Sequence, residues 1–419
     1  MSATSSDFIH DFVHFNSGNQ TAVKFRLWTA LSLINMAVGR RVFLDYSYFN
    51  LYLDSYVCLV GRQGLGKDTI MNEGFKIFKE ACPEYPIGAS VTSREKIVMR
   101  LCDDADTLRT FTDEHNSMVE WHPLAFFISE LKNFVSFNSE SMISFLIDIY
   151  NKKFFESDTV KRGLEPVKNP CLNILACENP PWVVNNLKAN VLSGGFVRRM
   201  MFVYETEELP RITFPKIPDG GYPARDRCIQ QLRDIQHVAG PFQWDSETTK
   251  SRFDKWNTTL QPTEDDLLRG FYQNRDCLVL KVAMALKLGR QPIELILDWP
   301  TIEEAILWIQ SLADTLPKLT IAAGRNELAV PTQEMLDILE GKGGIMPKKL
   351  WHRESIKRMN DFEFAGVMKS LKETDQLFVI KHQEVEVVVL PWKYKELMKK
   401  GEIVTQKKEL VKRDEPPQQ

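Results

Sequence analysis

Long hydrophobic runs are absent from this sequence. The longest apolar stretch, residues 27–38, is interrupted by Thr29, Ser32 and Asn35 and is too short to cross a bilayer. The N-terminal segment MSATSSDFIHDF carries neither the basic part nor the apolar part of a secretory signal. We therefore expect a cytoplasmic protein with no membrane partner.

Cysteine and histidine are sparse, with seven of each in 419 residues. The cysteines are scattered and often lie in apolar runs, as Cys58 does within residues 56–60, which is typical of reduced thiols in a core. His10 and His14 are one helical turn apart, but with no further ligand residues around them we interpret them as amphipathic helix residues. The sequence thus has no cysteine-rich zinc pattern or acidic metal cluster for primase or nuclease chemistry.

The composition is that of a globular protein, with 43% hydrophobic and 26% charged residues. Its length allows two or three domains with their own cores. The net charge of −3 conceals an asymmetry, because residues 342–413 hold 17 Lys and Arg against 10 Asp and Glu. This surplus of seven positive charges makes the C-terminal region the place to expect an anionic partner.

Apolar periodicity and turn-forming residues divide the chain into six segments. They are an N-terminal helical and β-rich preface (1–54), a core of alternating strands and helices (55–205), a Pro- and Gly-rich linker (206–223), an α-helical domain (224–329), a winged helix-turn-helix (330–393) and a flexible basic tail (394–419). Thr21 and Gly39 predict the cap and the end of a long helix in the preface. Strands that alternate with helices predict a parallel α/β sheet in the core.

The clearest motif runs from Gly61 to Lys67 and fits G-x-x-x-x-G-K. It follows a uniformly apolar segment that predicts a buried strand, and it precedes a predicted helix over residues 68–80. The glycines permit a tight turn that directs backbone N–H groups at phosphate oxygens, and the lysine reaches the β and γ phosphates. We therefore expect ATP binding through Gly61, Gly64, Gly66, Lys67, Asp68 and Thr69.

Two positions depart from the usual pattern of such loops. Asp68 stands where a Ser or Thr normally places its hydroxyl on Mg²⁺, and the next apolar strand ends in Ser129-Glu130 where Asp-Glu is usual. Our hypothesis is that Asp68 supplies the carboxylate near Mg²⁺ and Ser129 the hydroxyl, while Glu130 orients the attacking water. The alternative is a degenerate site that binds nucleotide but hydrolyses it poorly.

Two more polar positions flank predicted strands of the core. Asn179 follows the apolar residues 171–177 and either senses the γ phosphate or forms an ordinary Asn-Pro turn. Arg198 and Arg199 stand just before the last strand, after a Gly-Phe pair. Arginine suits bidentate contact with the phosphate charge of a transition state, and an arginine from a neighbouring subunit can complete a site.

Together these segments resemble the AAA+-related P-loop ATPases of phage and mobile-element replication, which occur in phage-type primase-helicase proteins and are akin to superfamily 3 helicases. The likeness spans roughly residues 8–316. The loop from Gly61 to Lys67 and the Gly-Phe-x-x-Arg element ending at Arg199 carry it, and the patterns at 27–31, 39–42 and 169–172 add to it. The resemblance implies an α/β P-loop NTPase (AAA+-like) fold, with a parallel sheet, an N-terminal helical preface, an α-helical lid domain and a C-terminal winged helix.

Transferred to this chain, the resemblance gives each matching residue a role. The roles are phosphate lysine for Lys67, catalytic carboxylate for Glu130, first sensor for Asn179 and trans-acting arginine for Arg199. Arg198 is the alternative for the last role. Arg275 is either a second sensor or a surface salt-bridge residue.

The resemblance also implies DNA contacts, because such ATPases act as rings, commonly hexamers, and some push DNA with a hairpin before the sensor strand. Residues 159–164 occupy that place, and the tip with Lys161 and Arg162 either contacts backbone phosphates or is a solvated turn. The predicted winged helix adds Lys369 and Lys372 on its third helix, unless it is a protein-binding module. Further basic residues nearby are Lys348, Lys349, Lys357 and Arg358.

We therefore expect an ATP- and Mg²⁺-dependent DNA helicase or translocase of a phage or other mobile element. It would act as a homo-oligomeric ring, with single-stranded DNA in its pore and with replication proteins as partners. The rival expectation is an ATP-binding switch, such as a helicase loader or regulator, with weak or no hydrolysis.

Overall fold

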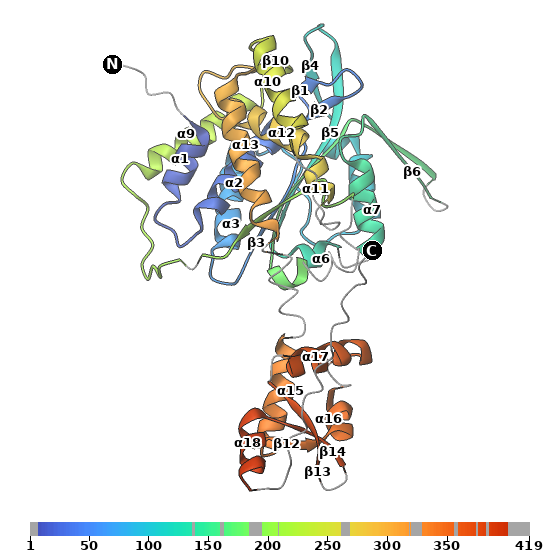
Figure 1. The fold of residues 1–419 in the computed structure, drawn as a ribbon. Coiled ribbons are helices and arrows are strands. Elements are labelled where there is room, and N and C mark those ends of the chain that lie inside the picture. The colour runs from blue at the N-terminus through green and yellow to red at the C-terminus, as the bar shows by residue number, and fades with distance from the viewer. Residues whose placement is uncertain are drawn as a thin grey trace, which may run out of the picture. The chain divides into compact units, whose positions relative to one another are not determined.

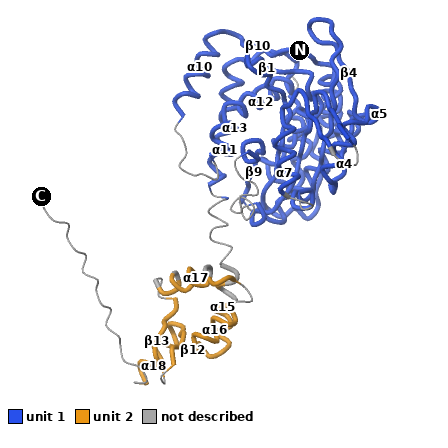
Figure 2. The backbone as a smooth tube through the Cα atoms, turned by 90° about the vertical axis from the view of Figure 1, so that its right-hand side faces the viewer, with its two compact units in different colours: residues 1–321 blue, residues 322–419 orange. Residues whose placement is uncertain are grey.

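The computed structural model describes residues 7–135, 139–159, 163–183, 195–207, 209–260, 269–317, 319, 329–355, 359–373, 376–382 and 385–400. The chain divides into two compact units, residues 1–321 and 322–419 (Figure 2). Lys161, Arg162, Lys357 and Arg358 lie outside the described residues, as does the tail beyond residue 400. Among the described residues, no helix has both the length and the apolar character needed to cross a bilayer.

A five-stranded sheet forms the centre of the first unit, with the strand order β4-β5-β8-β3-β9 (Figure 1). The strands are β3 (Tyr56–Gly61), β4 (Arg109–Thr112), β5 (Met118–Ile128), β8 (Pro170–Glu178) and β9 (Met200–Glu205). β5, β8, β3 and β9 are parallel, and β4 is antiparallel to β5. Every residue of β3 and β8 is buried, as their apolar sequences predict for strands covered on both faces. The predicted α/β class with a parallel-rich sheet is confirmed.

Helices cover this sheet, and four of them pack against one another on one side of it (Figure 1). These four are α1 (Phe8–Phe15), α2 (Val23–Val38), α3 (Lys67–Ala81) and α9 (Gly221–Ile235). Most of α2 is buried around its whole circumference, so it is a core helix rather than a surface one. Further helices of the unit are α4 (Arg94–Leu101), α5 (Asp104–Thr107), α6 (Leu131–Val135), α7 (Ser139–Ile149), α10 (Glu247–Thr258), α11 (Arg269–Gln273), α12 (Arg275–Leu288) and α13 (Trp299–Ala313).

A second, four-stranded sheet joins the preface to the region after residue 223. Its order is β11-β10-β1-β2, and its strands are β1 (Val42–Asp45), β2 (Asn50–Tyr52), β10 (Gly240–Trp244) and β11 (Ile296–Leu297). β1 pairs in parallel with β10, so the segment expected to be purely helical contributes two strands. The predicted linker, residues 206–223, therefore lies inside the first unit.

The hairpin expected before the sensor strand is present as β6 (Phe154–Thr159) and β7 (Gly163–Lys168), which pair antiparallel.

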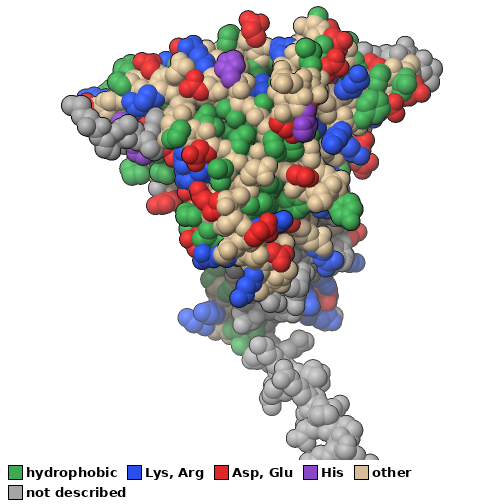
Figure 3. Space-filling view, turned by 90° about the horizontal axis from the view of Figure 1, so that it is seen from above, with side chains coloured by type: hydrophobic (Ala, Val, Ile, Leu, Met, Phe, Trp, Pro, Cys, Tyr) green, Lys and Arg blue, Asp and Glu red, His purple; other side chains and the backbone are tan. Residues whose placement is uncertain are grey.

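The predicted cap at Thr21 is wrong by one residue, because α2 has Ala22 as its N-cap. The Thr21 hydroxyl instead accepts a hydrogen bond from Arg26 Nε at 2.7 Å. Gly39 ends α2 as predicted, with φ +57°, and a Cβ there would collide with the Trp121 ring. In the view of Figure 3, basic and acidic side chains are mixed over the face of the first unit.

In its described residues, the second unit contains four helices and a three-stranded antiparallel sheet. Its elements are α15 (Ala329–Gly341), β12 (Ile345–Pro347), α16 (Lys348–Ser355), α17 (Asp361–Glu373), β13 (Phe378–His382), β14 (Val385–Val389) and α18 (Pro391–Lys399), with strand order β12-β14-β13. Its core surrounds the fully buried Trp351, whose indole N–H donates to the Met335 carbonyl. The start of the predicted flexible tail is instead α18, because Pro391 favours a helix start, Tyr394 stacks on Phe378 and Leu397 is buried.

Candidate nucleotide site

The loop between β3 and α3 turns at two glycines in the left-handed region. Gly64 has φ +88° and Gly66, the N-cap of α3, has φ +73°. The loop packs on the turn that precedes α2, where the Ala22 N–H donates to the Leu65 carbonyl at 3.3 Å. A Cβ on Gly66 would collide with the backbone carbonyl of Gln20. Glycine at 66 is thus required by both the backbone conformation and the close approach of this turn.

Lys67 is the first residue of α3 and is only 9% exposed. Its Nζ donates to the Gly61 carbonyl at 2.6 Å and to the Arg62 carbonyl at 3.0 Å. The ammonium group therefore lies over the loop itself, at the N-terminal end of a helix of 15 residues. An anion at this point would meet the lysine charge and the positive end of the helix dipole together.

A hollow of ≈ 440 Å³ opens over this loop, which is within the size range of small-molecule sites. It is lined by Gln20, Gln63, Gly64, Gly66, Lys67, Asp68 and Thr69. Five of the six predicted nucleotide-binding residues are in this lining, and the sixth, Gly61, supplies a carbonyl to Lys67. The structure thus brings the predicted loop residues together around one cavity.

Asp68 is exposed in the first turn of α3, and its carboxylate faces Cys177 near the end of β8, whose thiol lies 3.9 Å from Met71 Sδ. Burial and then the negative charge of Asp68 raise the pKa of Cys177 well above its usual range. Ser129 is exposed just after β5. Because β8 separates β3 from β5, the loop strand and the Ser129 strand are roughly 10 Å apart. No hydrogen bond joins Asp68 to Ser129, two residues that the structure describes.

The donor set at this edge of the sheet suits a hard, oxygen-preferring cation. Asp68 and Ser129 offer one carboxylate and one hydroxyl, and Mg²⁺ is typically held by one or two protein oxygens together with phosphates and water. In the part of the chain that the structure describes, no group of three or more His, Cys, Asp and Glu is arranged to hold a metal. A magnesium ion here would therefore depend on nucleotide phosphates for most of its ligands.

Glu130 is exposed after β5, with its carboxylate engaged locally. Its Oε2 accepts from Asn133 Nδ2 at 2.9 Å and lies 3.2 Å from Lys132 Nζ. Both members of the Glu130–Lys132 pair are well exposed, so solvent screens the pair and it contributes little to stability. The carboxylate can consequently be released toward a ligand at small cost.

Glu178, the last residue of β8, is a functional candidate that the sequence analysis passed over. It is 2% exposed and sits between the ends of β3 and β5, paired in register with Val60. Its two carboxylate oxygens accept the backbone N–H groups of Asn179 and Lys132, each at 2.8 Å, and burial raises its pKa. Glu178 follows a run of apolar strand residues, and the same pattern led us to select Glu130.

Of the two roles predicted for Asn179, the structure shows the turn-forming one. Its Oδ1 accepts the Trp182 backbone N–H at 3.1 Å and so caps the helical turn that begins at Pro180. Sensing of a γ phosphate by Asn179 stays a prediction.

Arg198 and Arg199 lie at the opposite edge of the sheet from Lys67. They precede β9, whose first residue, Met200, pairs with the first residue of β3. β3 has six residues, so the arginines are roughly 20 Å from the loop of their own chain. Arginines so placed can act on a triphosphate only in a neighbouring copy.

Arg275 does not fit the expectation of a surface salt bridge. It is 7% exposed at the start of α12, its guanidinium lies 5.3 Å from the Tyr272 ring centroid, and burial lowers its pKa. In the second unit, Lys369 and Lys372 are exposed three positions apart on α17, and Lys348 forms a 2.9 Å ion pair with Glu386. DNA binding by these lysines stays a prediction.

No protein-family model matches the chain, and no curated protein is significantly similar to it.

Proposed function

We propose that the first unit is a P-loop ATPase of the AAA+-related kind, which binds ATP over the loop from Gly61 to Lys67. The observation that carries the proposal is the position of Lys67, whose ammonium is held over the loop by the carbonyls of Gly61 and Arg62. The loop lies at the carboxyl end of a central parallel strand, where ligands bind in open α/β sheets. Triphosphate oxygens would replace the two carbonyls as partners of the ammonium and gain the backbone N–H groups of the glycine turn.

Hydrolysis is assigned to residues at the same edge of the sheet. Asp68 and Ser129 offer oxygen ligands to Mg²⁺, which when bound neutralises charge on the phosphates. Glu130 orients the attacking water, and for this its 3.2 Å contact with Lys132 has to open. Glu178 holds the Lys132 N–H and thereby positions the segment that follows Glu130.

The location of the arginines supports an oligomer. Because Arg199 and Arg198 are roughly 20 Å from their own loop, completion of the site requires a second copy of the chain. A closed ring, commonly a hexamer in ATPases of this kind, repeats the same contact between all copies. Single-stranded DNA in the pore, reached by the β6–β7 hairpin, is the corresponding substrate.

The second unit supports the same activity. Three helices followed by the β13–β14 hairpin fit a winged helix, with α17 as the helix that carries Lys369 and Lys372 toward DNA phosphates. We therefore assign the chain as an ATP-dependent DNA helicase or translocase of a phage or mobile-element replication system.

One observation favours a second candidate, an ATP-binding switch such as a helicase loader or regulator. Asp68 and Ser129, which should serve Mg²⁺ together, follow strands that are roughly 10 Å apart, because β8 lies between β3 and β5. A site in which the two residues stay apart in the presence of nucleotide would bind ATP but hydrolyse it slowly. The two candidates share the same loop and the same lysine.

Steady-state ATPase activity, with and without single-stranded DNA, separates the candidates. We compare wild type with Lys67→Ala, Glu130→Gln and the control Lys76→Ala. Lys76 is an exposed lysine of the same helix, and its described contact is an ion pair with Glu73. A motor shows DNA-stimulated turnover that Lys67→Ala abolishes and that Glu130→Gln reduces by about 10²–10⁴-fold. Lys76→Ala should behave as wild type.

Nucleotide binding, measured in parallel with a fluorescent ATP analogue, completes the comparison. Wild-type protein that binds ATP through Lys67 but shows no turnover with DNA is the switch. Wild-type protein that binds no ATP, or whose binding is unaffected by Lys67→Ala, overturns the assignment of the loop itself.

A further inference from the structure

A second hollow, of ≈ 310 Å³, lies at the edge of the central sheet opposite the loop. Four cationic side chains line it: Lys152 after α7, Arg198 and Arg199 before β9, and Lys281 on α12. Its described lining includes no Asp or Glu. Lys152 also forms a 3.7 Å ion pair with Asp148, an exposed pair outside the lining that solvent screens. A cavity that collects four cations from three parts of the chain, with no Asp or Glu in its described wall, is electrostatically prepared for an anion.

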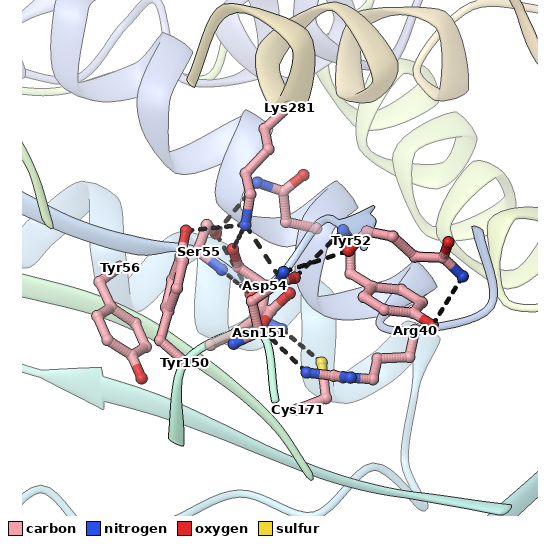
Figure 4. Close-up of polar contacts among 12 residues, drawn as sticks. Arg40, Tyr52, Asp54, Ser55, Tyr56, Tyr150, Asn151, Cys171 and Lys281 are labelled. Atoms are coloured by element: carbon pink, nitrogen blue, oxygen red, sulfur yellow. Dashed lines mark hydrogen bonds and ion pairs between the residues drawn. The ribbon is translucent and has the colours of Figure 1, made fainter. Parts of the chain in front are cut away.

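Behind this pocket, Asp54 lies between Lys281 and Arg40 (Figure 4). Lys281 is 2% exposed, and its Nζ donates to the Asp54 carbonyl at 2.6 Å and to the Tyr150 hydroxyl at 2.8 Å, with Asp54 Oδ1 at 3.8 Å. The same carboxylate faces the buried Arg40, whose Nη2 is 3.4 Å from Asp54 Oδ2. One carboxylate thus serves two buried cations, and burial lowers the pKa of Lys281.

Hydrogen bonds hold both arginines at the mouth of the pocket, and at least one guanidinium N–H, on Arg199, has no acceptor. Arg198 Nε donates to Asn274 Oδ1 at 3.3 Å, while Asn274 Nδ2 donates back to the Arg198 carbonyl at 2.9 Å. Arg199 Nη1 donates to the Gly195 carbonyl, but its Nε is buried without an acceptor. A buried N–H without an acceptor is costly, and a negative charge in the pocket would offset part of this cost for the Arg199 guanidinium. Burial also lowers the pKa of Arg199, which an anion would counteract.

We propose that this pocket binds a phosphate-bearing anion, with Lys152, Arg198 and Arg199 as its contacts and Lys281 as the buried charge behind them. Arginine pairs supply the forked donors that match phosphate oxygens. The anion is either free in solution or is the phosphate tail of a nucleotide on a neighbouring copy. Only the second source rests on the proposed function.

Binding of inorganic pyrophosphate to the full chain at low salt tests the free-anion source. All variants carry Lys67→Ala, which removes the loop as a competing site. We compare this background with one that adds Lys152→Ala and Arg198→Ala, two exposed positions at which truncation should leave the fold intact. The control adds Lys76→Ala and Lys250→Ala, two exposed lysines outside the pocket. Loss of the pocket cations should weaken binding by about tenfold for each, while the control stays unchanged.

Two arms distinguish the sources of the phosphate. Pyrophosphate bound by protein diluted to monomers, and lost in the pocket variant, identifies a free anion and holds even when the chain shows no ATPase activity. For the neighbour's nucleotide, Lys67→Ala subunits are mixed with Lys152→Ala/Arg198→Ala subunits, so that an intact pocket meets an intact loop. Turnover above that of either variant alone identifies this source. The proposal is overturned when pocket and control variants bind pyrophosphate equally and mixing restores no turnover.

Discussion

Replacing Gly66 by alanine should destabilise the first unit much more than the same change at Gly64, although both glycines belong to one loop. Both residues have positive φ, +73° and +88°, so alanine carries the same kind of backbone penalty at each. Their surroundings differ. A Cβ on Gly66 would collide with the Gln20 carbonyl oxygen and come within 2.6 Å of Thr21 Cγ2, whereas a Cβ on Gly64 meets nothing within 4 Å.

The magnitudes follow from these two terms. An L-residue in the left-handed conformation costs about 1–2 kcal/mol, and the lower entropy of unfolded alanine offsets about 0.4–1 kcal/mol of this. Gly64→Ala should therefore cost roughly 1 kcal/mol. Gly66→Ala adds about 1–3 kcal/mol for overpacking, because backbone atoms of the preceding turn have to move. The expected difference between the variants is thus about 1–3 kcal/mol.

Hydrogen exchange in a urea series, read on peptides from β3 and β9, measures this difference. Peptide resolution is needed because a chain with two compact units does not give one two-state signal. Adding Thr21→Ser to Gly66→Ala removes the methyl group at 2.6 Å and should recover part of the loss, while Ser keeps the hydroxyl that Arg26 contacts. Equal stabilities for Gly64→Ala and Gly66→Ala, within about 0.5 kcal/mol, would refute the packing of the loop on this turn.

Two further predictions concern buried ionisable groups. Asp54→Asn should cost the first unit about 3–5 kcal/mol in the same urea series read by hydrogen exchange, because it leaves Arg40 and Lys281 buried with no carboxylate, and adding Lys281→Met should recover part of that loss. Burial lowers the pKa of His122 below 6.5, with its Nδ1 3.0 Å from the Thr107 hydroxyl, so the unfolded chain takes up the proton first. Stability should therefore fall as pH drops below 6.5, and thermal melts at about pH 7.5 and 5.5 should show a smaller fall for His122→Gln than for wild type.

The elements that the sequence predicted well are those whose signal is local. The apolar runs of β3 and β8 are fully buried strands, and the helix after the loop begins at Lys67. β10 was missed because its five residues include Pro241, which normally argues against a strand, and its pairing with β1 joins residues 42–44 to residues 240–242. Long-range pairing of such short segments leaves no periodic pattern in the sequence.

The same contrast holds for the candidate site. The loop residues are contiguous, so one motif was enough to group them around the hollow. The pocket at the other edge takes Lys281 from a position 227 residues beyond Asp54, its hydrogen-bond partner. No spacing rule connects two such residues. Glu178 was missed for another reason. Its neighbour Asn179 matched the sensor position of the ATPases that the chain resembles, so the functional role was assigned to Asn179 and not to the buried carboxylate of Glu178.

The surroundings of Asp68 bear most directly on the choice between motor and switch. Burial and then the negative charge of Asp68 raise the pKa of Cys177, so the thiol stays protonated and adds no second negative charge beside the phosphates. No described hydrogen bond to the thiol has to break before the Asp68 carboxylate meets Mg²⁺, because the described partner of that thiol is Met71 Sδ. A carboxylate at position 68 and a hydroxyl at position 129 are the same two groups as in the usual hydroxyl and carboxylate pair, with their positions exchanged. These groups favour the motor, since they keep the oxygen ligands that hydrolysis requires.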